Sequence, residues 1–210
     1  RYLLYKDVNR HMKLGLGGNW KGGRPMTRNI PARPLTREAF AWYGQILDAD
    51  GWQNHYPIND GRCERFHDLA TAEAYGKHAR VIMSVFRATP YAFPLKLKMM
   101  ERHPFGSQAF MPLSPRPFLV VVAHDDDGKP GTPHAFITKP GQGVNYPRGL
   151  WHGVLTPIGE PQDFLVIDRA GDEKNVEEHH FKAPWKIHLP EGSTGDASLI
   201  DRLFDVIEND

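Results

Sequence analysis

Short apolar or β-branched runs, separated by turns rich in proline and glycine, fill residues 80–189. Runs of this length and composition, bounded by Gly and Pro, predict strands. The 18 prolines and 20 glycines of the chain supply the turns between them. Many short strands without alternating helices indicate a sandwich or barrel rather than a parallel α/β sheet. The runs are RVIMSVFRA (80–88), FPLKLKMMERH (93–103), FLVVVAH (118–124), HAFITK (134–139), GVNYPRGLWHGVL (143–155), QDFLVIDR (162–169) and WKIHL (185–189).

One segment before these runs has helical rather than strand periodicity. LTREAFAWYGQIL (35–47) places Phe40, Tyr43 and Leu47 on one face of a helix, and Thr36 is suited to the N-cap position. The sequence therefore predicts a single helix over residues 35–47, ahead of an otherwise all-β domain.

The chain divides into three parts. Residues 1–29 form a basic, Gly-rich segment that we expect to be a flexible leader, and residues 30–190 carry the strand pattern of the folded domain. Residues 191–210 begin with the flexible stretch EGSTG and continue with apolar positions spaced as in an amphipathic helix: Leu199, Leu203 and Ile207.

Charge is distributed unevenly, although the net charge of the chain is only +1. Residues 1–37 hold nine Lys or Arg and one acid, a balance of +8, and the other residues hold 17 against 24, a balance of −7. A basic arm could bind nucleic acid. Because this arm has no clear helical or strand period, we expect a leader without a nucleic-acid partner.

A single cysteine, Cys63, excludes a disulfide framework, and no apolar run approaches the length of a membrane span. These features favour a cytoplasmic protein without a membrane partner.

The run LKLKMMERH changes character along its length. In a regular strand, one face would carry Leu95, Leu97, Met99, Glu101 and His103. The other face would carry basic side chains that favour water, so we predict that Glu101 and His103 point inward. A buried carboxylate needs a partner, which a metal, a ligand or the neighbouring histidine could provide. The alternative is that the strand ends at the rim and water solvates both groups.

A second segment carries matching chemistry. Gly141-x5-Pro147-x-Gly149-x2-His152-x3-Thr156 resembles the second cupin motif, with Thr in place of the final Asn. The spacing of the first cupin motif, H-x-H-x4-E, is filled here by Glu101-x-His103-x4-Gln108. The resemblance implies an all-β cupin-type double-stranded β-helix, or jelly-roll barrel. It also implies four metal-ligand positions: Glu101, His103, Gln108 and His152.

Two His, one Glu and one Gln form a ligand set that binds a metal ion more weakly than three His and one Glu. The set suits a labile divalent ion, and it equally suits a metal-free acid/base pair, so both interpretations stay open here.

Several segments together resemble the ureidoglycolate lyase family, also called ureidoglycolate hydrolase, over about residues 30–189. The resemblance implies a homodimeric cupin of purine (allantoin) catabolism that cleaves (S)-ureidoglycolate to glyoxylate and urea. A divalent metal, with nickel one candidate, is associated with the family, and no organic cofactor is implied. The segments are PINDGRCERFHDLA (57–70), SVFRATP (84–90), MMERHPFGSQAFMPL (99–113), FLVVVA (118–123), GQGVNYPRGLWHGVLTP (141–157) and FLVIDR (164–169).

Cleavage of such a substrate needs a base for the hydroxyl proton, an acid for the leaving nitrogen and cations or donors for the carboxylate. Glu101 with His103 or His152 offers the acid and base: our hypothesis is Glu101 as the base and a histidine as the proton donor, with the reverse assignment as the alternative. The carboxylate could be bound by an arginine fork, for which the candidates are Arg65, Arg87 and Arg148. Further candidate hydrogen-bonding groups are Ser107, Gln108 and Tyr146.

Each arginine has a surface salt bridge as its alternative, and Ser107 and Tyr146 have structural turn roles as theirs. His179 and His180 are interpreted as part of a solvated charge run.

Two other functions fit the same pattern: a different metal-dependent cupin enzyme acting on a small hydroxy or keto acid, and a non-catalytic cupin that binds a small acid.

Overall fold

A computed structural model describes residues 28–190. The predicted leader (1–29) lies almost entirely outside the described residues, and the predicted C-terminal linker and helix (191–210) lie wholly outside them.

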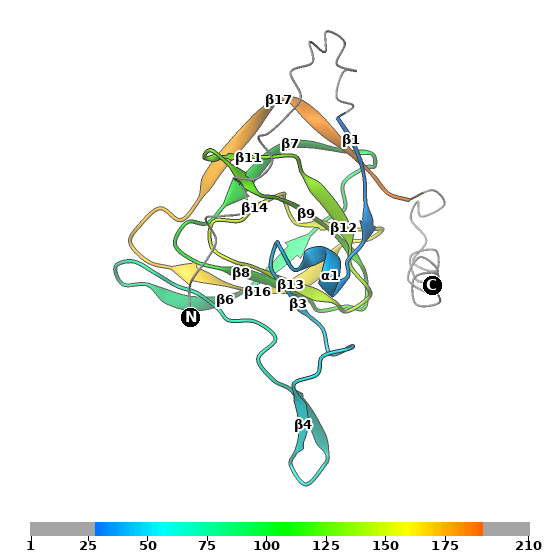
Figure 1. Cartoon of the computed structure of the whole chain (residues 1–210), viewed down its shortest axis with the longest axis vertical. Coiled ribbons are helices and arrows are strands. Elements are labelled where there is room, and N and C mark those ends of the chain that lie inside the picture. The colour runs from blue at the N-terminus through cyan, green and yellow to red at the C-terminus, as the bar shows by residue number, and fades with distance from the viewer. Residues whose placement is uncertain (1–27, 191–210) are drawn as a thin grey trace, which may run out of the picture.

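The described residues form two principal sheets (Figure 1). The first sheet runs in the order β1-β17-β7-β14-β9-β12-β2, with β15 paired to β9. Its strands are β1 (Asn29–Pro31), β2 (Arg33–Pro34), β7 (Leu95–Arg102), β9 (Phe118–Ala123), β12 (His134–Ile137), β14 (Trp151–His152), β15 (Thr156–Pro157) and β17 (Glu177–His188).

The second sheet has the order β3-β13-β8-β16-β6. Its strands are β3 (Gln45–Leu47), β6 (Arg80–Ala88), β8 (Gln108–Pro112), β13 (Gly143–Tyr146) and β16 (Gln162–Ala170). Two small hairpins complete the strands: β4 (His55–Ile58) with β5 (Cys63–Phe66), and β10 (Asp125–Asp126) with β11 (Lys129–Pro130). Figure 1 shows the β4–β5 hairpin projecting away from both sheets.

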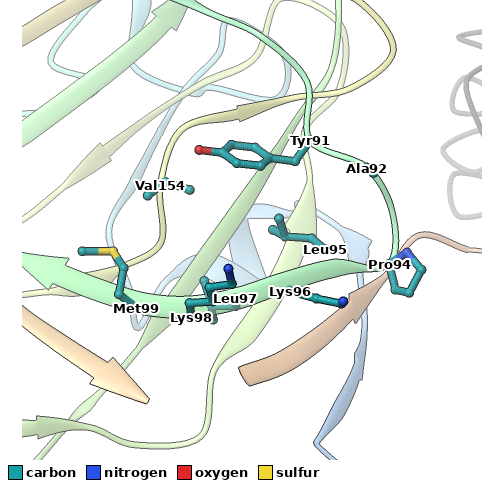
Figure 2. A pocket seen from close by; sticks show the side chains of 9 residues that line it. All are labelled: Tyr91, Ala92, Pro94, Leu95, Lys96, Leu97, Lys98, Met99 and Val154. Carbon is teal, nitrogen blue, oxygen red and sulfur yellow. The ribbon is translucent and has the colours of Figure 1, made fainter. Parts of the chain in front are cut away.

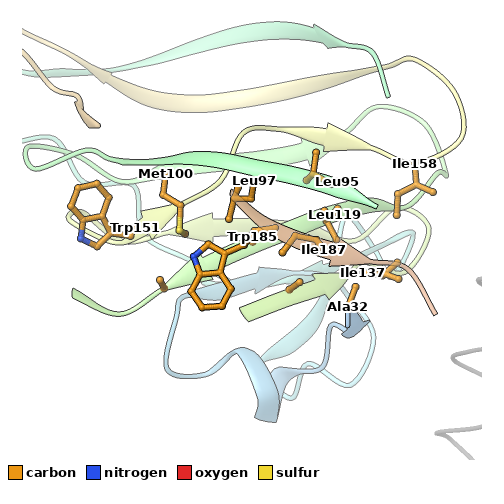
Figure 3. Close-up of a cluster of buried hydrophobic side chains, with 13 residues drawn as sticks. Ala32, Leu95, Leu97, Met100, Leu119, Ile137, Trp151, Ile158, Trp185 and Ile187 are labelled. Atoms are coloured by element: carbon orange, nitrogen blue, oxygen red, sulfur yellow. The ribbon is translucent and has the colours of Figure 1, made fainter. Parts of the chain in front are cut away.

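The first sheet nearly closes on itself. Strand β1 pairs with β17 and strand β2 pairs with β12, while only Ala32 separates β1 from β2 along the chain. Apolar side chains on one face of this sheet gather in a cluster that includes Leu97, Leu119 and Trp185 (Figure 3). The fold is therefore the cupin-type all-β barrel that the motifs predict.

A second cluster fills the space between the two sheets. Phe118 and Val122 of the first sheet meet Phe110, Val144 and Phe164 of the second. Because strand side chains alternate between faces, Val120, Tyr146 and Val166 also point into the layer between the sheets.

The predicted helix over residues 35–47 is wrong in length. Helix α1 covers only Arg37–Phe40, although Thr36 caps it as predicted by accepting a hydrogen bond from the Ala39 N–H. The next residues turn, and Gln45–Leu47 become strand β3, paired with β13. Gly44 permits this change because a Cβ there would lie 2.3 Å from the Asn145 carbonyl oxygen. Long-range pairing therefore overrides the local helical period.

The seven predicted runs all contain strands, but the structure has more strands than were predicted. The run 143–155 is split into β13 and β14, and the strands not predicted are β1 to β5, β8, β10, β11 and β15. His179 and His180 both belong to the long strand β17. The interpretation as a solvated charge run holds for His180, which is exposed beside Glu178, whereas half-buried His179 packs edge-on against Trp151. No helix within residues 28–190 has the length and hydropathy to cross a membrane.

Candidate active site and metal-ligand cluster

Polar and ionisable side chains converge at one end of the layer between the sheets. In the first sheet, His152 lies opposite Glu101 on one side and Val122 on the other. In the second sheet, Tyr146 lies opposite Gln108. The ligand atoms of Glu101, His103 and His152 all lie within 4.8 Å of one another. The structure thus brings together the residues of the two cupin-like motifs, which are about forty positions apart in the sequence.

Glu101 reaches this cluster for a reason other than the predicted alternation. Leu95, Leu97 and Met100 all belong to the cluster inside the first sheet. Leu97 and Met100 are three positions apart, so the alternation of a regular strand, in which every second residue faces the same side, is broken between them. The register of β7 against β17 shifts at the same place, between His180 and Trp185. The predicted single face from Leu95 to His103 is therefore wrong, because this irregularity turns Glu101 away from the leucines and toward His152.

His152 is a buried, neutral histidine. Its Nδ1–H donates to the Gly153 carbonyl oxygen at 3.1 Å, and the Tyr146 ring stacks on its imidazole with ring centroids 4.8 Å apart. Nε2 is buried and has no hydrogen-bond partner within residues 28–190. Burial, and secondarily the charge of His103, lower the pKa of His152 to about 3. The Nε2 atom therefore directs an unshared lone pair at the cluster.

His103 is held in a similar orientation. Its Nδ1–H donates to the Asn175 carbonyl oxygen at 2.6 Å, so Nε2 is the nitrogen that faces inward. That Nε2 lies 3.2 Å from Oε1 of Gln108, and the imidazole rings of His103 and His152 are 5.1 Å apart.

Glu101 is a half-buried carboxylate whose pKa is raised above its ordinary value. Burial is the main cause, the charge of His103 opposes it, and the nearby carboxylate of Glu178 adds to it. Glu178 lies directly opposite Glu101 on β17. A carboxylate with a raised pKa is a stronger base, which suits a group that takes and returns protons.

Arg102 fixes the strand ends around the cluster without entering it. Its guanidinium donates to Glu177 and to Asp125, both at 2.6 Å, and lies over the Trp151 ring. The Trp151 indole N–H also donates to Asp125, and this bond is the main cause of the lowered pKa of Asp125. Since the four residues belong to β7, β10, β14 and β17, the network ties these strands together beside the site. The expectation that the basic side chains of LKLKMMERH lie on the face opposite Glu101 agrees with this position of Arg102.

The chemistry of the donor set fits a divalent cation. Both histidines bind a backbone carbonyl through Nδ1 and direct Nε2 toward the cluster, which is the usual arrangement of metal-bound imidazoles. Glu101 adds a carboxylate and Gln108 an amide oxygen. The strongest single indication of a cation is Nε2 of His152, because a buried acceptor without a hydrogen-bond partner costs free energy that a bound ion would offset.

Comparison with known proteins identifies the family to which this barrel belongs. A sequence model described as "Ureidoglycolate lyase" matches residues 27–188. The chain belongs to the ureidoglycolate lyase family. It is 68% identical over 165 residues to a "Ureidoglycolate lyase" of Mesorhizobium japonicum, covering 79% of this chain and 100% of that protein.

Two further relatives agree with this membership. A "Ureidoglycolate lyase" of a Chelativorans species is 58% identical over 164 residues, covering 78% of this chain and 99% of that protein. "Ureidoglycolate lyase 2" of Rhizobium meliloti is 51% identical over 158 residues, covering 75% and 96% respectively. The family assignment rests on the same residues that form the barrel.

The candidate substrate-binding arginines of this ureidoglycolate lyase family member lie in different places. Arg87 is exposed and paired with Asp163 toward the other end of β16, and Arg65 lies on the β4–β5 hairpin over the Tyr56 ring. The backbone next to Arg148 touches the site, because Gly149 donates its N–H to the His103 carbonyl oxygen at 2.9 Å, while the Arg148 guanidinium lies over the Tyr75 ring. Ser107 is buried, and its hydroxyl accepts the Glu73 N–H.

Sequence reasoning missed Asp168. Phe164 and Val166 of β16 point into the layer between the sheets, and Asp168 continues that row at its end. The signal was present in QDFLVIDR, where an apolar row ends in an ionisable group as it does at Glu101. Burial raises the pKa of Asp168, whereas a hydrogen bond from the Gln108 side chain and the charge of His103 lower it.

A pocket of about 480 Å³ lies away from this cluster. It is lined by Leu95, Leu97 and Met99 of β7, by Val154, and by Tyr91, whose ring lies over the strand in Figure 2. None of the four candidate metal ligands lines it, so its mainly apolar surface is separate from the chemistry of the site.

Proposed function

We propose that this protein is a lyase that cleaves (S)-ureidoglycolate to glyoxylate and urea. The observation that carries the proposal is the convergence of Glu101, His103 and His152 within 4.8 Å of one another. The family membership supports it, since relatives that match the whole barrel are named ureidoglycolate lyase.

The reaction requires two proton movements and no redox partner. The substrate carbon carries a hydroxyl, a carboxylate and the ureido nitrogen. Removal of the hydroxyl proton allows the oxygen to form a carbonyl, the C–N bond breaks, and its electron pair leaves with nitrogen. Protonation of that nitrogen yields urea, and the remaining fragment is glyoxylate.

Glu101 is the base in this scheme, because its carboxylate lies in the cluster and burial raises its pKa. His152 is not the proton donor, since a pKa of about 3 leaves it neutral. His103 takes that role when no ion is bound. Its Nδ1–H is already donated to Asn175, so a proton on Nε2 would point toward the Gln108 oxygen and the cluster.

The same residues support a divalent cation, with nickel one candidate. Glu101, His103, His152 and Gln108 would hold it. A bound cation would supply Lewis-acid polarisation of the hydroxyl and carboxylate oxygens. In that form His103 Nε2 would be a ligand, and Glu101 would still exchange the proton. Assay after chelation distinguishes the two uses: full activity without metal assigns His103 as donor, and loss restored by Ni²⁺ assigns it as ligand.

Substrate contacts follow from the position of each candidate. We propose Arg148 as the partner of the substrate carboxylate, because its chain segment is bonded to His103. Gln108 and Tyr146 are proposed as hydrogen-bonding groups at the second sheet, where they lie opposite one another.

The direct test is incubation of the purified protein with racemic ureidoglycolate, followed by measurement of glyoxylate, urea and ammonia. Urea equimolar with glyoxylate, from one enantiomer, supports the lyase. Release of ammonia and carbon dioxide would mean hydrolysis of the ureido amide, and no consumption of either enantiomer would contradict both activities.

We also propose a homodimer in the cytoplasm. The outer face of the second sheet supports the dimer, because Val81, Met83 and Val85 of β6 are exposed in a row, with Leu165 and Ile167 of β16 beside them. Such an apolar sheet face is typical of a protein interface. The single cysteine of the chain is consistent with a reducing compartment.

A further inference from the structure

Asp168 occupies a defined place opposite the candidate catalytic residues. Ile167 pairs with Ala109, so the register brings Asp168 beside Gln108. Gln108 in turn lies opposite Tyr146. These three residues form a cross-strand row on the second sheet. The contact between His103 Nε2 and Gln108 Oε1, at 3.2 Å, links this row to the Glu101–His152 row of the first sheet.

Within residues 28–190, only one of the two oxygens of the Asp168 carboxylate is hydrogen-bonded. The Gln108 side chain hydrogen-bonds to the carboxylate, whereas Oδ1 is buried and has no hydrogen-bond partner within residues 28–190. The adjacent Arg169 does not neutralise it, because its guanidinium binds the Tyr75 carbonyl and Glu173. A buried acceptor without a partner is destabilising, so such an atom at a site indicates a ligand donor.

We propose that Asp168 Oδ1 accepts an N–H hydrogen bond from the ureido group of the substrate, and so defines the subsite for urea. This proposal rests on the proposed function. The ureido group carries N–H donors at both nitrogens, and a carboxylate is an acceptor of matching chemistry. The substrate is thereby oriented with its ureido end at β16 and its hydroxyl and carboxylate at the first sheet.

The two ends of the substrate become separate products, which allows a specific test. In this arrangement urea and glyoxylate should each inhibit the reaction from their own subsite. Replacing Asp168 should therefore weaken inhibition by urea and leave inhibition by glyoxylate unchanged. A residue with only a structural role would alter both inhibition constants together, or neither.

The experiment measures the KM for ureidoglycolate and both product inhibition constants in the wild-type protein and in Asp168→Asn and Asp168→Ala. Loss of a charge-assisted hydrogen bond predicts that KM and the constant for urea rise by about 10- to 100-fold. The constant for glyoxylate should stay within about twofold. Asp163→Asn, on the same strand but paired with Arg87, is the matched control and should leave all three values unchanged.

Two further measurements keep the outcomes distinct. Metal content by mass spectrometry should be equal in wild type and Asp168→Asn, and the near-isosteric Asn variant should retain the wild-type melting temperature within a few degrees. If the wild type cleaves ureidoglycolate but both constants rise equally or neither changes, the urea subsite is wrong. If the wild type does not cleave it, the proposed function is wrong.

Discussion

Burial acts in opposite directions on the two central ionisable residues. It raises the pKa of Glu101 and lowers that of His152, because in both cases the charged form is disfavoured. The sequence supplied the residue types but left the acid and base unassigned. The tertiary environment separates them, since a neutral His152 is suited to accept or ligate and not to donate a proton.

Replacing the base should remove most of the activity. We expect Glu101→Gln to lower kcat/KM for ureidoglycolate by about two to four orders of magnitude. In the wild type, activity should fall as pH decreases through a midpoint above the ordinary carboxyl pKa of roughly 4.3, because protonated Glu101 cannot act as a base. Glu178→Gln removes the opposing negative charge and should move that midpoint to lower pH. A midpoint that Glu178→Gln does not move would contradict the assignment to Glu101.

Buried neutral His152 should also make stability depend on pH. Its pKa is about 3 when folded and roughly 6.5 when unfolded. Its contribution is therefore complete above pH 6.5 and is lost as pH falls toward 3, because the unfolded chain binds the proton first. The slope is at most about 1.4 kcal/mol per pH unit.

Urea unfolding of chelator-treated protein at pH 7 and pH 4.5 measures this slope. His152→Gln should be less sensitive to pH than the wild type, while His180→Gln, at an exposed site, should keep the wild-type slope. Equal slopes in all three proteins would rule out a buried neutral His152.

At the scale of single elements, two local patterns gave way to long-range pairing. The helical period of residues 35–47 ended at Phe40, and the strand period of residues 95–103 broke before Met100. In both places a partner strand decides the conformation: β13 pairs with β3, and β17 shifts its register against β7.

Gly44 offers a test of the first of these boundaries. Gly44→Ala raises helix propensity, yet its Cβ would lie 2.3 Å from the Asn145 carbonyl oxygen. We expect the clash to dominate and to lower the free energy of unfolding by about 1–3 kcal/mol. Gly131→Ala is the control, because its Cβ would meet the nearest atom at an ordinary 3.4 Å and should cost less than about 0.5 kcal/mol. A neutral or stabilising Gly44→Ala would contradict this explanation.

At the scale of the whole molecule, the two sheets serve different purposes. The nearly closed first sheet buries its own core, while the second sheet covers one side of it and leaves an apolar outer face. The polar cluster lies where the layer between them ends, so the sheet that supplies Glu101 and the histidines is completed by the sheet that supplies Gln108 and Asp168.

The apolar outer face predicts the assembly. Light scattering should give a dimer for the wild type, and the double variant Met83→Glu, Val85→Glu should be monomeric, because charges would be buried at the interface. Lys98→Glu, on an exposed position of the first sheet, should remain dimeric. If the double variant on β6 were still dimeric, the interface would lie elsewhere on the protein.

Removal of residues 1–27 should leave ureidoglycolate cleavage within about twofold of the full chain. The reason is that the family match begins at residue 27, and relatives matched over 100% and 99% of their own length pair with about 165 residues of this chain. Steady-state kinetics of the truncated protein is the measurement. A large loss would favour a function for the basic segment, such as the nucleic-acid binding considered from its charge.

The sequence by itself determined the strand-rich barrel, because alternation, turn residues and motif spacing are local properties. The resemblance of its motifs to the cupin motifs also implied one set of site residues: Glu101, His103, Gln108 and His152. The tertiary structure alone decided which neighbours these residues face. It separated Arg87 from the site, added Asp168, and fixed His152 as neutral. Burial and cross-strand register decide these features, and both depend on contacts between segments far apart in the chain.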